Sequence, residues 1–181
     1  MTDVAPARRF AGLVYRAHNP RWAYAPTCGE GAARHGGRFN PRGMPALYTT
    51  LDPKTAWMEA QQGMPFKAQP LTLVAYRVDC ERVVDLTDPV VLSAVGIADE
   101  ILSCPWEDLA TRGLMPPTWG LAETLIHAGH HGVVVPSFAP GTGKEDLNLV
   151  LWRWSDGAPC RVEVIDDFSR LPKDDASWRG R

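Results

Sequence analysis

The chain has 181 residues, which fits a single domain with at most a short tail. Its composition, 45% hydrophobic and 22% charged, is that of a globular protein able to bury a substantial core. The formal charge is −2, from 19 Lys+Arg against 21 Asp+Glu, so the overall charge gives no reason to expect a nucleic acid as a direct partner. No apolar run approaches the roughly 20 residues that span a bilayer, so no membrane partner is expected.

The four cysteines are widely spaced and form no CxxC pair, which disfavours zinc and thioredoxin-like sites. The first ten residues lack the apolar segment of a signal peptide. We therefore expect a cytoplasmic protein with its cysteines as free thiols. They are Cys28, Cys80, Cys104 and Cys160.

The N-terminal part begins with a basic lead-in, residues 1–9, followed by an apolar run over residues 10–15 that predicts the first strand. Residues 17–45 are rich in Gly, Pro, Asn and Arg and show little periodicity. Irregular segments of this length are uncommon inside a compact domain and are often functional. A functional site is therefore expected near this segment.

Three helices are expected from their start and stop signals. Asp52 as N-cap and a proline after it predict a helix from residue 53 to about 62, ended by Gly63. Asp88 and the proline after it open a second helix over 90–102, and Thr118 is expected to cap a third. The third helix would span residues 119–128 and end at Gly129.

Further strands are expected from short apolar or alternating runs. They cover residues 46–50, 71–78, 83–86, 132–136, 147–154 and 161–165, and the last two are expected to be neighbours. Strands outnumber helices and do not alternate with them, so the predicted class is α+β, a single domain, rather than a doubly wound α/β fold. Residues 166–181 are polar and are expected to form a tail.

The segment from His35 to Pro41, HGGRFNP, is the most informative. Two glycines allow positive φ angles and a close approach to a ligand. Arg38 would follow them on a tight turn, where a guanidinium can pair two phosphate oxygens. A surface turn with a solvated arginine is the alternative.

Glu59 shares a helical face with small residues, Ala56, Ala60 and Gly63, which is unusual for a carboxylate because burial is costly without a partner. The alternative is a solvent-facing glutamate paired with Lys54 or Lys67.

Ser137 directly follows a buried strand and precedes a Gly-rich loop, so it could reach a phosphate or a ribose hydroxyl, although a serine at such a place usually only forms a turn. Neither a P-loop nor a GxSxG nucleophile motif is present. Three histidines, at 127, 130 and 131, lack the HExxH context of a zinc site, so no metal is expected. They are expected to interact with the helix dipole.

Several segments together resemble the RES-domain family. They are the Tyr15-Arg16 strand end, the GGRFNPRG segment of residues 36–43, Leu47-Tyr48-Thr49-Thr50, the Thr55–Glu59 helix, Pro117-Thr118-Trp119, the VVVPS run ending at Ser137, and Asn148-Leu149-Val150-Leu151. The resemblance covers roughly residues 10–155, within a domain expected over 10–165. Tyr48 ten residues after Arg38 and Glu59 eleven further on make the pattern quite specific.

The resemblance implies a toxin of a toxin–antitoxin system whose mixed β-sheet core with flanking helices is similar to that of ADP-ribosyltransferases. It implies NAD⁺ as substrate, no metal, and an Xre-like antitoxin as partner. By the resemblance, the site consists of Glu59, Arg38, Tyr48 and Ser137, with Arg16 as a phosphate contact.

Three functions stay open on the sequence alone. The first is cleavage of the nicotinamide–ribose bond of NAD⁺ by phosphorolysis or hydrolysis, and the second is transfer of ADP-ribose to a host metabolic protein. The third is a non-catalytic binding module. The family often has Ser at the place of Thr50, and smaller side chains in place of Trp57 and Met58, so this bulky pair is expected to narrow the site or alter the acceptor.

Overall fold

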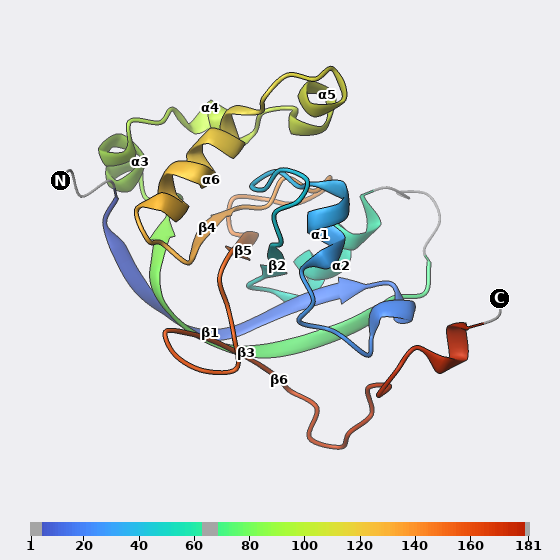
Figure 1. Ribbon diagram of the computed structural model, residues 1–181. Coiled ribbons are helices and arrows are strands. Elements are labelled where there is room, and N and C mark those ends of the chain that lie inside the picture. Colours follow the sequence, from blue (N-terminus) through green and yellow to red (C-terminus); the bar gives the residue numbers. More distant parts are fainter. Residues whose placement is uncertain (1–4, 63–68, 180–181) are drawn as a thin grey trace.

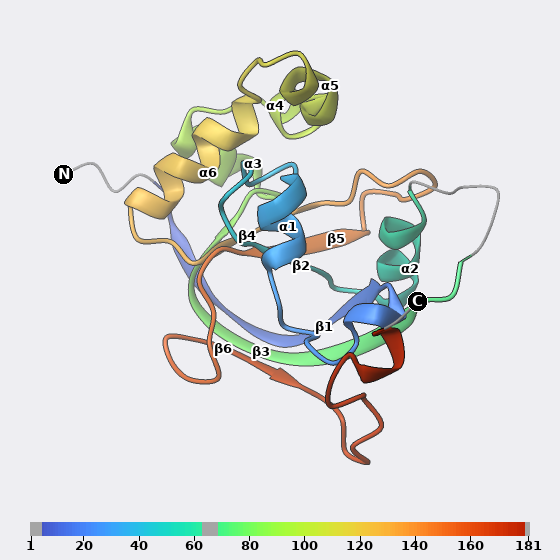
Figure 2. The same ribbon diagram turned by 45° about the vertical axis from the view of Figure 1, so that its right-hand side comes forward.

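The computed structural model describes residues 5–62 and 69–179. Its centre is a six-stranded mixed β-sheet, drawn in Figures 1 and 2, in which β1 and β3 run side by side as long curved strands. The strands are β1 (Ala7–His18), β2 (Leu47–Thr50), β3 (Thr72–Asp85), β4 (Gly132–Pro136), β5 (Leu147–Leu151) and β6 (Cys160–Val164).

The strand pairings close on themselves. β1 pairs with β2, β2 with β5, β5 with β4, β4 with β3, and β3 again with β1. β6 is added on the outside, along β3. The β3–β4 pair is parallel and the other described pairs are antiparallel, so the sheet is mixed. This confirms the predicted α+β class with a single mixed sheet.

Short helices cover this sheet. The helix α6 lies with α3, α4 and α5 at the end where β3 meets β4, whereas α2 packs beside β1 (Figures 1 and 2). None of the described helices has the length and apolar character needed to cross a membrane. The helices are α1 (Glu30–His35), α2 (Pro53–Gln61), α3 (Pro89–Val95), α4 (Asp99–Leu102), α5 (Trp106–Thr111) and α6 (Pro117–His127), with two 3₁₀ turns, η1 (Pro20–Trp22) and η2 (Ala176–Trp178).

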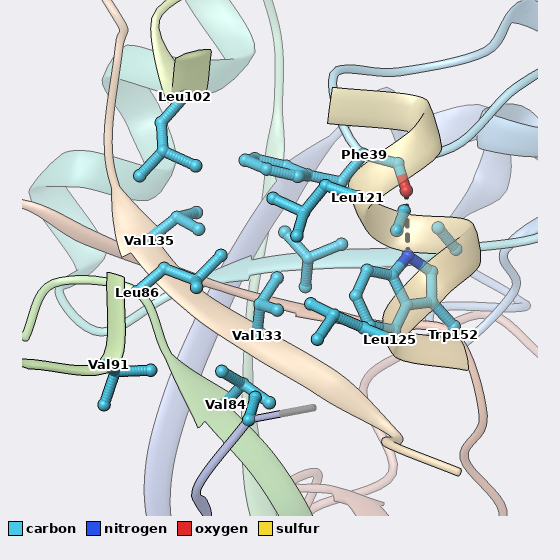
Figure 3. Packing of buried hydrophobic residues seen from close by; sticks show 14 residues of the cluster. Phe39, Val84, Leu86, Val91, Leu102, Leu121, Leu125, Val133, Val135 and Trp152 are labelled. Atoms are coloured by element: carbon cyan, nitrogen blue, oxygen red, sulfur yellow. Dashed lines mark hydrogen bonds between the residues drawn. The ribbon is translucent and has the colours of Figure 1, made fainter. Parts of the chain in front are cut away.

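Two apolar clusters occupy opposite faces of the sheet, as the alternation of side chains along a strand requires. On β4, Val133 and Val135 belong to one cluster and Val134 to the other. Figure 3 shows the first cluster, where Leu121 and Leu125 of α6 pack over the sheet. This packing holds α6 against the strands that carry the site.

Several predicted elements are confirmed. Strands form at the expected places around residues 10–15, 46–50 and 132–136, and the first begins at Ala7, within the expected lead-in. The helix α2 begins after Asp52, whose carboxylate accepts hydrogen bonds from the backbone N–H groups of Lys54 (2.8 Å) and Thr55 (3.2 Å). The expected stop at Gly63 lies outside the described residues.

Other predictions were wrong, for local reasons. The two strands expected over 71–78 and 83–86 are one strand, β3, which continues through Arg82 at a φ of 55°. The single helix expected over 90–102 is interrupted at Gly96, which adopts a left-handed φ of 72°, so α3 and α4 are separate. Thr118 does not cap α6: its side chain is fully buried, and Pro116 holds the cap position.

Two long-range expectations also need correction. The last two strands are not neighbours, because β5 lies between β2 and β4 whereas β6 pairs with β3. Cys80 and Cys160 are not free thiols: they lie opposite each other in the β3–β6 register, both buried, and are joined by a disulfide. Cys28 and Cys104 are thiols, as expected.

Candidate active site

A pocket of about 380 Å³ opens between the start of β5, the ends of β1 and β2, the helix α2 and the loop that follows α1. Its volume lies within the range of small-molecule sites, roughly 300–1,000 Å³. Arg38 and Glu59, 21 residues apart in the chain, both line it. Other lining residues are Tyr15, Arg16, Tyr48, Phe138 and Asn148.

Glu59 lies half-buried on α2 and its carboxylate is held from three sides. The Ser137 hydroxyl donates to Oε1 at 2.5 Å, and the Asn148 Nδ2 donates to the same oxygen at 2.6 Å. Gln62 donates to Oε2. The expected alternative, a solvent-facing glutamate paired with Lys54, is not what the structure shows, and Lys67 lies outside the described residues. These donors hold the carboxylate in a fixed position.

The loop of residues 36–40 depends on its two glycines. Gly36 has a φ of 76°, which favours glycine, as predicted. A Cβ on Gly37 would lie 2.7 Å from the Asn40 Oδ1 and closer still to the Tyr48 hydroxyl. A close approach to a ligand was predicted for the glycines. At Gly37 the close approach is instead to the side chains of Asn40 and Tyr48.

The same loop is anchored by two indole N–H groups from other parts of the chain and by its own Asn40 side chain. The indole N–H groups of Trp119 on α6 and Trp152 after β5 donate to the carbonyl oxygens of Gly37 and Phe39, each at 2.8 Å (Figure 3 shows the second of these bonds). The fully buried Asn40 donates to backbone carbonyls on both sides of the loop. The loop that carries Arg38 is therefore rigidly supported.

Tyr48 on β2 completes this anchoring. Its hydroxyl donates to Asn40 Oδ1 at 2.7 Å and accepts from the Phe39 N–H at 3.0 Å, while the residue lines the pocket. Burial raises the pKa of the Tyr48 hydroxyl far above its usual value, so the side chain stays neutral. Tyr48 therefore combines a structural hydroxyl with a position in the pocket wall.

Arg38 is partly buried at the other side of the pocket. Its Nη1 donates to the carbonyl oxygens of Cys104 (2.6 Å) and Leu102 (3.2 Å), and its guanidinium lies 4.5 Å from the centre of the Phe138 ring. Desolvation lowers the pKa of Arg38, and the nearby Glu59 opposes that shift. An arginine remains charged over the physiological range. Both backbone contacts use Nη1, and no backbone carbonyl of residues 5–62 and 69–179 accepts from Nη2 or Nε.

Arg16 on β1 also lines the pocket, but its Nη1 is engaged with the backbone. It donates to the carbonyl oxygens of Cys28 (3.0 Å) and Pro26 (3.2 Å). Arg16 thus fixes the segment before α1 while its charge stays at the edge of the pocket.

Several other residues singled out from the sequence do not line the pocket. Ser137 is buried, is not among the residues that line the pocket, and acts on Glu59 instead. Trp57 is 42% exposed and, like Met58, is not on the pocket wall, so the expected narrowing by this pair is not seen. His127 Nδ1 lies 2.8 Å from the carbonyl oxygen of Glu123 near the end of α6. No group of three potential metal-binding side chains exists within the described ranges.

Asn148 and Gln62 are contacts of Glu59 that sequence reasoning missed. Asn148 is a polar residue in an otherwise apolar strand, opposite Val135 in the β4–β5 register, and this interruption is the signal that could have indicated a function. Since a carboxylate only accepts hydrogen bonds, the amide must present Nδ2 to Glu59.

We expect Asn148→Asp to reduce turnover of the pocket's substrate by more than tenfold near pH 8. The substitution replaces a donor 2.6 Å from Glu59 Oε1 by a second carboxylate of nearly the same shape. Two carboxylates at this distance cannot both ionise easily, and a shared proton restores an O–H donor. The loss should therefore shrink at pH 5 to 6.

The pH–rate profiles of the parent, Asn148→Asp and Asn148→Ala measure this effect. The alanine variant, which lacks a titratable group, should lose activity by a similar factor across the range. Parallel profiles for Asp and Ala would contradict the positioning role.

Comparisons with protein families and with solved structures both find matches. The RES-domain family model matches residues 13–174, most of the chain. A chain of the crystal structure of the M. tuberculosis MbcT–MbcA toxin–antitoxin complex is similar in fold, with a TM-score of 0.55 and 24% sequence identity, over 88% of this chain and 84% of that one. Comparison with curated protein sequences finds no match.

The single mixed α+β domain thus carries a pocket of small-molecule size with Arg38 and Glu59 on its walls. The chain belongs to the RES-domain family.

Proposed function

We propose that this protein cleaves the nicotinamide–ribose bond of NAD⁺ by phosphorolysis or hydrolysis. The observation that carries the proposal is the placement of Glu59, fixed by Ser137 and Asn148, in the same pocket as Arg38. In one pocket, a carboxylate can stabilise positive charge on a ribose and a guanidinium can bind a diphosphate. Membership of the RES family supports the same reading.

The carboxylate has a direct chemical role in this reaction. Nicotinamide leaves as a neutral molecule with the electrons of the broken bond, and positive charge develops on the ribose C1 and its ring oxygen. Glu59 lies in the pocket as a fixed negative charge that stabilises this oxocarbenium-like state. The acceptor oxygen of phosphate or water then bonds to C1, which gives ADP-ribose 1″-phosphate or free ADP-ribose and a proton.

The remaining side chains orient the substrate. The Nη2 and Nε donors of Arg38 would pair with diphosphate oxygens, with the Arg16 charge beside them. The Tyr48 ring would provide a flat wall for the nicotinamide. Ser137 would act by holding the carboxylate, since its hydroxyl already donates to Glu59.

We further propose that the protein is a toxin silenced by an Xre-like antitoxin, in the cytoplasm, and that its sheet is of the ADP-ribosyltransferase type. The fold is similar to a chain of a solved toxin–antitoxin complex, which supports an antitoxin partner. An antitoxin would act most simply by covering the pocket.

Incubation of the purified protein with NAD⁺, with and without phosphate, tests the proposal. We expect loss of NAD⁺ and release of nicotinamide, with ADP-ribose 1″-phosphate or ADP-ribose as the second product by mass spectrometry. Labelled NAD⁺ in a cell lysate provides the other arm: label on protein would indicate ADP-ribosyl transfer instead. Intact NAD⁺ in both arms would contradict the proposal.

A further inference from the structure

A second, smaller pocket of about 190 Å³ lies next to the first. Both pockets share Arg16 and Gly31, so they are neighbours across the start of α1. Apart from Arg16, the smaller pocket is lined by residues between 18 and 35, to which none of the roles above assigns a function. They include Trp22, Tyr24, Cys28, Arg34 and His35.

The lining combines aromatic rings with charged side chains of both signs, since Arg34 and Glu30 line it as an ion pair at 2.5 Å. Trp22 is 44% exposed although it is a large apolar residue, and the ring of Tyr24 lies 6.4 Å away, centre to centre, tilted by 38°. The guanidinium carbons of Arg21 and Arg34 lie 5.5 and 6.0 Å from the Trp22 ring centre. Exposed aromatic rings beside arginines bind nucleic-acid bases by stacking while the cations attract the attached phosphate.

Hydrogen bonds from other elements hold the segment that forms this pocket in place. Arg16 and the Tyr76 hydroxyl (2.8 Å) both donate to the Pro26 carbonyl oxygen, and Trp154 donates to that of Thr27 at 3.0 Å. The segment between Tyr24 and α1 is thus tied to the sheet at successive residues. A ligand would meet a prepared surface there.

We propose that the smaller pocket accepts the adenine base of NAD⁺, with the diphosphate crossing from one pocket to the other past Arg16. The inference rests on the proposed function for the identity of the ligand. The reacting ribose must lie at Glu59 in the larger pocket, and a dinucleotide carries its second base at the opposite end of the diphosphate. Arg16 is the charged side chain that borders both pockets.

Gly31 provides a sharp test of the connection. A Cβ at this position meets no atom within 4 Å, so a larger side chain has space where it leaves the backbone and would occupy the junction of the two pockets. Gly120 on α6 is the matched control, because a Cβ there also meets nothing and it lines neither pocket. Trp57, 42% exposed on α2, is the matched control for Trp22.

The experiment measures AMP binding by titration calorimetry for the parent, Trp22→Ala, Gly31→Leu, Trp57→Ala and Gly120→Leu. We expect Kd for AMP to rise about tenfold or more in the first two variants, as loss of base stacking does, and to stay within twofold in the two controls. Circular dichroism melting verifies that all five proteins are folded.

Two results would overturn the inference: no AMP binding by the parent at millimolar concentration, or equal affinity in Trp22→Ala and the parent. Both are independent of catalysis. If the parent cleaves NAD⁺ but gives either result, the proposed function stands and the base pocket is rejected. If the parent binds AMP through Trp22 but leaves NAD⁺ intact, the base pocket stands and the proposed reaction is rejected.

Discussion

Glu59→Gln should lower NAD⁺ turnover by at least about 100-fold, while leaving the protein folded. The glutamine carbonyl can still accept the hydrogen bonds that Ser137 and Asn148 now donate to Oε1. The amide NH2 takes the place of Oε2 and cannot accept from Gln62, which is exposed and can turn to offer its own oxygen. The side chain therefore keeps its place and its volume and loses the negative charge. A transition state with positive charge on the ribose is the species that this loss destabilises, so kcat should fall more than NAD⁺ affinity.

The measurement is nicotinamide release by liquid chromatography, together with the melting temperature. Glu123→Gln is a matched control, because Glu123 is an exposed carboxylate of α6 away from the pocket, and it should leave both quantities unchanged. Turnover of Glu59→Gln within a few fold of the parent would remove Glu59 from the reaction.

Arg38→Lys should raise Kd for NAD⁺ by about tenfold or more even though the charge is retained. Hydrogen bonds to charged groups contribute about 1.5–3 kcal/mol, and lysine cannot offer the paired Nη2 and Nε donors to a diphosphate. A lysine also cannot reproduce the two carbonyl contacts that orient the guanidinium beside the Phe138 ring. Arg38→Ala, which removes the charge too, should weaken binding further.

Binding of NAD⁺ to the Glu59→Gln protein, which should not consume it, provides the background in which to measure both Arg38 variants. Arg112→Lys, at the exposed residue that follows α5, is the control for a general effect of an arginine-to-lysine exchange. Unchanged affinity in Arg38→Lys and Arg38→Ala would place the diphosphate elsewhere.

Features of the fold that depend on a few adjacent residues could be predicted. The start of α2 follows from Asp52 and Pro53, and the positive φ of Gly36 from the glycine pair before Arg38. Local hydrogen bonding and steric limits determine these features, so neighbouring residues suffice.

Features that depend on which strands become neighbours could not be predicted. The disulfide of Cys80 and Cys160 arises because β6 pairs with β3, 80 residues earlier in the chain. Likewise Asn148 meets Glu59 only because β5 lies beside β2, near the start of α2. Periodicity within one segment carries no information on such pairings.

The fold brings the predicted site residues together, but the polar atoms of two of them make contacts that were not expected. Ser137 was expected to reach a phosphate or a ribose hydroxyl, and its hydroxyl instead donates to the Glu59 carboxylate. Tyr48 was placed in the site by the family resemblance, and its hydroxyl also supports the Arg38 loop. A residue type and its spacing can indicate membership of a site, whereas the partner of each polar atom requires coordinates.

The anchored loop of residues 36–40 has a thermodynamic consequence for ligand recognition. Trp119, Trp152 and Tyr48 restrain its backbone before any ligand arrives. The conformational entropy of this segment is therefore lost when the chain folds, and association need not lose it again. Without one of the two indole N–H groups, the loop would be less ordered before binding and would lose conformational entropy when the ligand binds. Affinity would then fall although no direct contact to the ligand had changed.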